Sequence, residues 1–155
     1  MAEVSKKPRP KNTKRTGELS EAAFLHKAVA EGFGVAKPWG DSERYDFILD
    51  NGDRLLRVQV KCTAYLRARG YDIQPIYTDR THKAAYTEKD IDALIAHIVP
   101  LDVWYVIPIA VFARTKSLRF YPDAECKRAR FEHYREAWHL LRCNSCYADS
   151  PVRKQ

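Results

Sequence analysis

The sequence predicts an α/β fold in which a mixed sheet of four to five strands is flanked by helices. An Ala-, Leu- and Glu-rich helical segment comes first, a hairpin signal within alternating apolar residues follows, and a short, almost wholly apolar run lies further along the chain. With 155 residues, 45% of them hydrophobic, the chain is long enough to bury a single core. One domain is therefore expected.

The first element is a helix that is expected to begin at Gly17. Ala, Leu and Glu dominate it, and Gly32 or Gly34 can end it. Its apolar stripe is expected to contain Phe24, Leu25, Ala28 and Val29. Glu21 lies three and four residues before the first two members of this stripe, so its carboxylate is expected on the inward side. Because burying an unpaired charge is costly, Glu21 needs a partner there.

Two strands joined by a tight turn are expected next, over residues 45–49 and 55–63. The intervening DNGD sequence is a strong hairpin signal. Side chains alternate along the second strand, so Gln59 and Lys61 share one of its faces.

The expected register places Asp46 on this same face. We expect Asp50 to pair with Asp53 across the turn. Asp46 then lies opposite Arg57, and Gln59 is its diagonal neighbour at roughly 7–8 Å between backbones. Long side chains can close that gap onto one ion.

Five further elements are expected after the hairpin: strands over residues 71–77, 102–107 and 118–121, and helices over residues 88–97 and 123–142. The DVWYVI run before Pro108 is almost uninterruptedly apolar, which is typical of a strand buried on both faces. Thr87 starts the first of these helices, with Asp90 as the acidic member of a capping-box-like start. The second helix has an apolar stripe of Phe131, Tyr134, Trp138 and Leu141.

The polar residues on the shared strand face suit hydrolysis of a phosphodiester. A hard divalent cation polarises the phosphoryl oxygen and lowers the pKa of bound water. Mg²⁺ needs only one or two carboxylates beside the substrate oxygens, and a nearby lysine can orient the water and offset transition-state charge. Asp46, Gln59 and Lys61, with Glu21 from the preceding helix, offer these groups.

These residues resemble the PD-(D/E)XK nuclease superfamily. Glu21 on a first helix, Asp46 in RYDFILDNG and Gln59-Val60-Lys61 in RVQVKCT are similar to its motif. The helix–strand–hairpin–strand–helix order resembles its restriction-endonuclease-like core. The short chain and the DVWYVIP segment are similar to the group I intron homing endonuclease branch and, more distantly, to archaeal Holliday junction resolvases. The resemblance covers residues 17–112, within a nuclease domain expected over residues 17–155.

The resemblance implies a role for each motif position. Asp46 would be the central metal ligand, Gln59 would take the second acidic position, and Lys61 would be the motif lysine. Glu21 would act through the metal or one of its waters, and the backbone carbonyl of Val60 would face the ion. Mg²⁺ or Mn²⁺ is the cofactor that this site implies.

Two positions depart from the family motif. Tyr45 stands in place of the proline, and the uncharged Gln59 leaves two carboxylates rather than three. The implied activity is that of a Mg²⁺-dependent DNA endonuclease, either homing-endonuclease-like or structure-specific. Because one such site cuts one strand, a homodimer or homotetramer is expected. A catalytically silent DNA-binding module and a structural or interaction protein with an incidental basic tail are the alternatives.

Positive charge is concentrated in residues 1–16, which are expected to form a disordered basic arm. The net charge is +7 for the chain and +5 for this arm, which has six basic residues and one acidic residue. Such an arm suits phosphate contact through counterion release, although a merely solubilising terminus has the same composition. DNA contacts are expected from Lys11, Lys14, Arg15, Arg67, Arg69, Arg80 and Lys83. An ordinary solvated loop is the alternative for the last four.

Cytoplasmic residence is expected because the N-terminus has no apolar export signal, and no apolar run of about eighteen residues predicts a membrane span. The four cysteines are then expected to be reduced thiols. Cys143 and Cys146 have the CxxC spacing of half a zinc site, but no second ligand pair accompanies them. The three tryptophans are expected in the core rather than stacked on bases.

Overall fold

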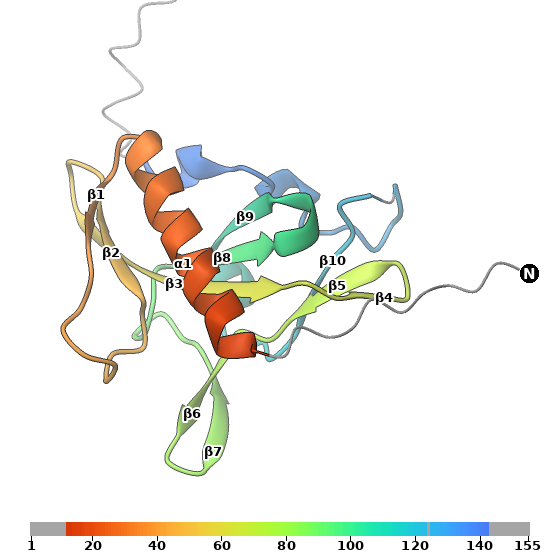
Figure 1. The fold of residues 1–155 in the computed structure, drawn as a ribbon, viewed down its shortest axis with the longest axis horizontal. Helices are drawn as coiled ribbons and strands as arrows, with labels where there is room; N and C mark the ends of the chain where they lie inside the picture. Colours follow the sequence, from red (N-terminus) through yellow and green to blue (C-terminus); the bar gives the residue numbers. More distant parts are fainter. Residues whose placement is uncertain (1–11, 124, 143–155) are drawn as a thin grey trace, which may run out of the picture.

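A five-stranded mixed sheet forms the centre of the molecule in the computed structural model, which describes residues 12–123 and 125–142 (Figure 1). In spatial order its strands are β1 (Gly34–Ala36), β2 (Phe47–Asp50), β3 (Leu55–Thr63), β8 (Ala93–Ile98) and β9 (Val103–Pro108). β3 pairs antiparallel with β2 and parallel with β8, and β8 pairs antiparallel with β9. The predicted mixed α/β sheet is confirmed.

Helix α1 (Thr13–Ala30) crosses one face of this sheet (Figure 1). Asn12 caps it, since its side-chain oxygen accepts a hydrogen bond from the Arg15 backbone N–H at 3.0 Å. The helix thus begins four residues before Gly17. The prediction that the disordered arm reaches residue 16 is wrong for residues 13–16, which are helical, and Asn12 caps them. Residues 1–11 of the arm, including Lys11, lie outside the described residues.

The buried stripe of α1 is narrower than the sequence predicted. Ser20, Phe24 and Ala28 are buried at a spacing of four residues, whereas Leu25 is 43% exposed and Val29 57% exposed. The prediction that the latter two face inward is wrong. A single row at this spacing is enough to contact one sheet face, and the neighbouring row turns toward solvent.

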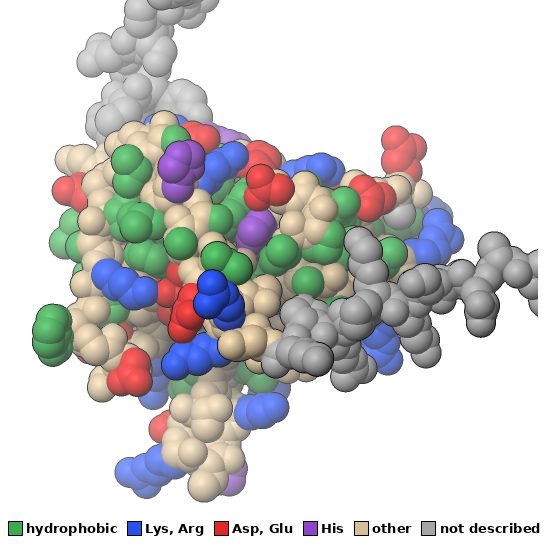
Figure 2. Space-filling view, in the orientation of Figure 1, with side chains coloured by type: hydrophobic (Ala, Val, Ile, Leu, Met, Phe, Trp, Pro, Cys, Tyr) green, Lys and Arg blue, Asp and Glu red, His purple; other side chains and the backbone are tan. Residues whose placement is uncertain are grey.

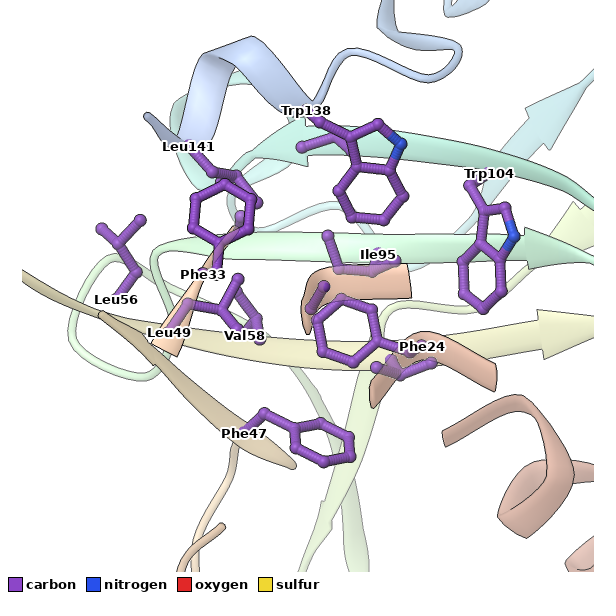
Figure 3. Packing of buried hydrophobic residues seen from close by; sticks show 14 of the residues in the cluster. Phe24, Phe33, Phe47, Leu49, Leu56, Val58, Ile95, Trp104, Trp138 and Leu141 are labelled. Carbon is purple, nitrogen blue, oxygen red and sulfur yellow. The ribbon is translucent and has the colours of Figure 1, made fainter. Parts of the chain in front are cut away.

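The main hydrophobic core lies between α1 and the sheet (Figure 3). The ring of Phe24 lies 5.0 Å from that of Phe47 and 6.4 Å from that of Trp104. Trp138 closes this core from the C-terminal segment at 6.3 Å from Phe24. Trp104 and Trp138 therefore occupy the core as predicted. Trp39 does not, because it is 100% exposed.

A second core fills the opposite face of the sheet. It is covered by a small sheet of β10 (Leu118–Phe120), β5 (Gly70–Ile73) and β4 (Leu66–Arg67), together with the short helix α2 (Ile109–Phe112). The strand predicted over residues 71–77 is divided into β5 and β6 (Ile76–Asp79). Pro75 lies between them and has no N–H to donate to a sheet. β6 and β7 (His82–Ala85) form a hairpin that projects from the body (Figure 1).

The helix predicted over residues 88–97 is wrong, because its second half belongs to β8 and its first half is a turn. All six β8 residues are buried, and they alternate between the two cores: Ala93 and Ile95 face one, Leu94 and Ala96 the other. A run of mostly apolar residues fits a buried helix as well as a central strand. The segment is a strand because it pairs with β3 on one side and with β9 on the other. The contact between Thr87 and Asp90 does form, at 2.8 Å, but it closes a turn.

The helix predicted over residues 123–142 is also wrong. In the described part of this segment, the helical pieces are the short 3₁₀ helices Glu132–Tyr134 and Trp138–Leu141. Between them, the Glu136 backbone N–H donates to the Trp104 carbonyl at 2.7 Å, so the chain extends past the edge of β9. The predicted apolar stripe is shared between the two cores, since Phe131 packs in one and Trp138 in the other. One straight helix cannot reach both faces.

Candidate functional site

Asp46 immediately precedes β2 and lies opposite Gln59 of β3. The observed pairs run from Phe47 with Val58 to Asp50 with Leu55, and the Asp46 backbone N–H donates to the Val58 carbonyl at 2.9 Å. The predicted pairing of Asp50 with Asp53, and of Asp46 with Arg57, is therefore wrong by two residues.

The turn is longer than predicted because the Asn51 side chain organises it. The Asn51 Oδ1 atom accepts hydrogen bonds from the backbone N–H groups of Asp53 and Arg54, at 3.0 and 2.9 Å. Since side chains alternate with a period of two, a shift of two residues keeps Asp46 on the predicted face. The error in register thus brings Asp46 and Gln59 closer than expected.

Two donors from β3 hold the Asp46 carboxylate. The Gln59 Nε2 atom donates to Oδ2 at 2.7 Å, and the Val60 backbone N–H donates to the same oxygen at 2.9 Å. Among the described residues, no group donates a hydrogen bond to Asp46 Oδ1 or to Gln59 Oε1. These two oxygens are the ones available to a ligand.

Burial raises the pKa of the Asp46 carboxyl group, and the Val60 N–H opposes that rise. The negative charge of Glu21 raises the same pKa further, while the positive charge of Lys61 lowers it. Both charges therefore act on Asp46. Lys61 makes no hydrogen bond or ion pair with Glu21, Asp46 or Gln59, all of which are described residues.

This raised pKa predicts that Asp46 destabilises the fold when it is ionised. The folded protein holds the Asp46 proton more tightly than the unfolded chain, so the free energy of unfolding falls as pH rises from the unfolded pKa toward the higher folded one. Asp46→Asn, whose amide oxygen can still accept from Val60, is expected to raise Tm above that window and to change it little below. Thermal unfolding in EDTA from acid to neutral pH measures this, and equal Tm values at neutral pH would contradict it.

Glu21 is half-buried and forms an ion pair with Lys37. The Lys37 Nζ atom lies 2.7 Å from Glu21 Oε2 and 5.1 Å from the centre of the Phe47 ring. Lys37 was missed by the sequence reasoning. It follows β1 in a loop, far from Glu21 along the chain, and no periodic pattern marks it.

Glu21 and Asp46 line one cleft of about 470 Å³, between the N-terminal half of α1 and the loop that leads into β2. Lys14 and Lys37 line it too. Figure 2 shows acidic and basic side chains meeting beside this part of α1. Val58 and Val60 of β3 pack under α1. Gln59 and Lys61 alternate with these valines, so they belong to the sheet face that points away from α1. Asp46 shares the cleft with Glu21 and a hydrogen bond with Gln59.

The donor atoms at this site fit a hard divalent cation. Carboxylate oxygens of Asp46 and Glu21 and the amide oxygen of Gln59 are the ligand type that Mg²⁺ prefers, with water completing the shell. Within residues 12–123 and 125–142, no three His, Cys, Asp or Glu side chains gather into a metal-binding group. The cleft thus offers the carboxylates of Glu21 and Asp46, and Gln59, which does not line the cleft, adds an amide group hydrogen-bonded to Asp46.

A polar network that is buried at Ser20 and His97 and ends at the exposed Asp102 ties α1 to the sheet next to Glu21, and sequence reasoning missed it. Ser20 Oγ lies 2.9 Å from His97 Nδ1, and His97 Nε2 lies 3.1 Å from Asp102 Oδ1. The His97 ring stacks on Trp104 at 3.8 Å. Burial lowers the pKa of His97, against the opposing effect of Asp102. Because Ser20 is only 3% exposed, the network fastens the helix rather than meeting a substrate.

Six of the seven predicted DNA-binding residues are described, and all six are exposed and form no ion pair with another described residue. Arg67 and Arg69 lie at the β4–β5 turn, and Arg80 and Lys83 lie on the β6–β7 hairpin. None of these four forms an ion pair with another described residue. Lys14 lines the cleft, and Arg15 is exposed beside it on the first turn of α1.

Two of the four cysteines lie in the described part of the chain. Cys62 and Cys126 are free thiols, whereas the Cys143–Cys146 pair lies outside the described residues. No helix in the described part of the chain is both long and apolar enough to cross a bilayer.

The mixed sheet, the hairpin that carries Asp46 and Gln59, and the helix that carries Glu21 define a nuclease fold. Residues 11–141 match the PD-(D/E)XK endonuclease family, and the chain belongs to that family. The structure is similar to that of a bacterial homing endonuclease, I-Ssp6803I, with a TM-score of 0.75 and 30% identity over 89% of this chain and 97% of that chain. The predicted family and fold class are thereby confirmed.

A second solved structure, that of MepB, is similar at a TM-score of 0.44 and 12% identity, covering 74% of this chain and 94% of that chain. No curated protein matches the sequence.

Proposed function

We propose that this protein is a Mg²⁺- or Mn²⁺-dependent DNA endonuclease of the homing type. The observation that carries the proposal is the direct hydrogen bond between Gln59 and Asp46, beside a cleft that Glu21 also lines. It groups three oxygen-bearing side chains in a chain that belongs to an endonuclease family. The likeness to I-Ssp6803I, at 30% identity, supports the homing type over a structure-specific one.

Asp46, Gln59 and Glu21 would hold the ion, with the backbone carbonyl of Val60 as a further ligand. When bound, the ion supplies Lewis-acid activation of the phosphate and a more acidic water. Two N–H groups donate to Oδ2 of Asp46, so Oδ1 is the oxygen that would bind the ion. Lys61 would orient the attacking water and offset the charge that develops on the phosphate.

The position of Gln59 favours a catalytically active site over an inactive one. Its amide nitrogen donates to Asp46, where a glutamate would place a second negative charge beside a buried carboxylate. Its amide oxygen stays available to the ion. The cost is a weaker electrostatic attraction for the cation, so millimolar Mg²⁺ is the expected working range.

DNA is the proposed substrate because exposed cations without ion pairs among the described residues lie at the cleft and on two hairpins. Lys14 lines the α1 side of the cleft, and Arg15 is the next residue on α1. Four further cations lie on two hairpins: Arg67, Arg69, Arg80 and Lys83. Guanidinium and ammonium groups without internal partners can neutralise phosphates. Since one cleft cuts one strand, a homodimer or homotetramer is proposed for double-strand cleavage.

Cleavage of supercoiled plasmid tests the proposal. Wild-type protein is expected to nick and then linearise plasmid carrying its target when Mg²⁺ or Mn²⁺ is added, and to do neither in EDTA. Retention of DNA on a filter, measured in parallel without divalent metal, separates the alternatives. DNA retention with neither cutting nor Mg²⁺ binding by calorimetry would favour the silent DNA-binding module. Failure to retain DNA at all would favour the structural protein.

A further inference from the structure

The β6–β7 hairpin is the one described element pair that forms a sheet of its own and stands off the body (Figure 1). Its strands pair from Ile76 with Ala85 to Asp79 with His82, which leaves Arg80 and Thr81 as a two-residue turn. Every residue from position 78 to position 83 is exposed. Their side chains make no hydrogen bond with any other described residue.

The base of the hairpin packs against the body through Tyr77, whereas its tip is exposed. The Arg44 guanidinium lies 4.2 Å from the centre of the Tyr77 ring and donates to Asp90 at 2.6 Å. Tyr77 in turn packs on Tyr86 at 5.1 Å. Arg44 stands two residues before Asp46, in the loop that forms one wall of the cleft. The hairpin therefore has a set direction relative to the candidate cutting site.

The chemistry of the tip distinguishes base recognition from simple phosphate contact. A surface that only grips phosphates needs cations alone, but this tip mixes the acceptor Asp79 and the hydroxyls of Thr78 and Thr81 with the cations Arg80 and Lys83. Acidic, hydroxyl and guanidinium side chains are the groups that read base edges. A protein partner would call for large apolar anchors, which positions 78–83 do not contain.

Arg80 has a backbone conformation that favours glycine, with φ of 55°. A long, exposed side chain therefore occupies a turn position where glycine would be the less strained residue. Arginine suits bidentate contact with the O6 and N7 atoms of guanine.

We propose that residues 78–83 enter the major groove of duplex DNA and read base edges beside the bond that is cut. A two-stranded ribbon fits a groove about 12 Å wide. The inference rests on the proposed function for its substrate, and it assigns this hairpin to target choice and not to the chemical step. Lys61 and Asp46 make the cut, and the hairpin determines where.

Selection from a randomised duplex pool tests this assignment. Wild-type protein, Arg80→Gly and Lys83→Ala are incubated with the pool and Mg²⁺, and the cut ends are sequenced. Arg80→Gly also relieves the positive φ, so it is expected to fold. It should lose discrimination at one or two base pairs by roughly 10- to 100-fold, which appears as a flattened preference at those positions of the sequenced ends.

Lys116→Ala is the matched control, since Lys116 is an exposed cation that belongs to neither strand nor turn of the hairpin and has no ion pair among the described residues. It should keep the wild-type motif. An unchanged motif in Arg80→Gly and Lys83→Ala, or an equal loss of affinity for all sequences, would overturn the inference.

The same pool, selected for binding by filter retention in EDTA, separates this inference from the proposed function. A wild-type binding motif that Arg80→Gly flattens supports the hairpin as a reader even if no cutting occurs. Wild-type cutting without any sequence preference would overturn the hairpin inference and leave the endonuclease intact.

Discussion

Lys61→Ala is expected to slow metal-dependent DNA cleavage by roughly 10²- to 10³-fold at saturating DNA, which is the usual cost of removing one preorganised donor to a developing charge. The positive charge of Lys61 already acts on the buried Asp46 carboxylate. Alanine removes the ammonium group while leaving the backbone pairing of β3 with β8 unchanged. The loss should therefore appear in kcat and leave DNA affinity nearly unaltered.

Single-turnover cleavage of a plasmid measures the rate, and thermal unfolding checks that the variant is folded. Lys89→Ala is the control, because Lys89 is exposed and lies outside the cleft. Wild-type cleavage by Lys61→Ala would remove Lys61 from the mechanism. Asp46→Asn should be as slow as Lys61→Ala, yet more stable than wild type at neutral pH, because burial penalises the ionised carboxyl group.

That opposition between stability and activity at Asp46 explains why a destabilising charge is retained. A carboxylate that burial and Glu21 both disfavour is one that a cation stabilises strongly on arrival. Gln59 moderates the penalty by donating to Asp46. The ion in the proposed function would offset the electrostatic penalty that Asp46 carries when it is ionised.

Local patterns were enough to predict the parts of the site that lie on one hairpin. The period-two alternation of β3 gave Gln59 and Lys61 a common face, and that face did not change when the register proved wrong by two residues. Helix α1 was also predicted from local composition, so Glu21 could be assigned to it. These features depend on residues close together in the chain.

Contacts between distant segments could not be predicted in this way. The partner of Glu21 is Lys37, and the partner of Ser20 is His97, 77 positions away. β8 satisfied a helical pattern as well as a strand pattern, and only its place between β3 and β9 separates the two. Tertiary pairing overrides local preference in such segments.

The same distinction between local pattern and tertiary contact can be measured in α1. The sequence predicted that Phe24 and Leu25 both face the core, whereas the structure buries Phe24 completely and leaves Leu25 43% exposed. Phe24→Ala is expected to lower the free energy of unfolding by about 3–5 kcal/mol, because the cavity would form among Phe47, Trp104 and Trp138. Leu25→Ala should change it by no more than about 0.5 kcal/mol.

Urea unfolding followed by circular dichroism compares these two neighbours directly, since both substitutions remove a large apolar side chain from the same helix and both introduce a good helix former. Equal destabilisation by the two would mean that α1 is rotated about its axis from the orientation that buries Phe24 and exposes Leu25. Such a rotation would carry Glu21 away from Lys37 and out of the cleft, because residues of one helix turn together. The stability of these two variants therefore tests the position of the Glu21 carboxylate independently of any cleavage assay.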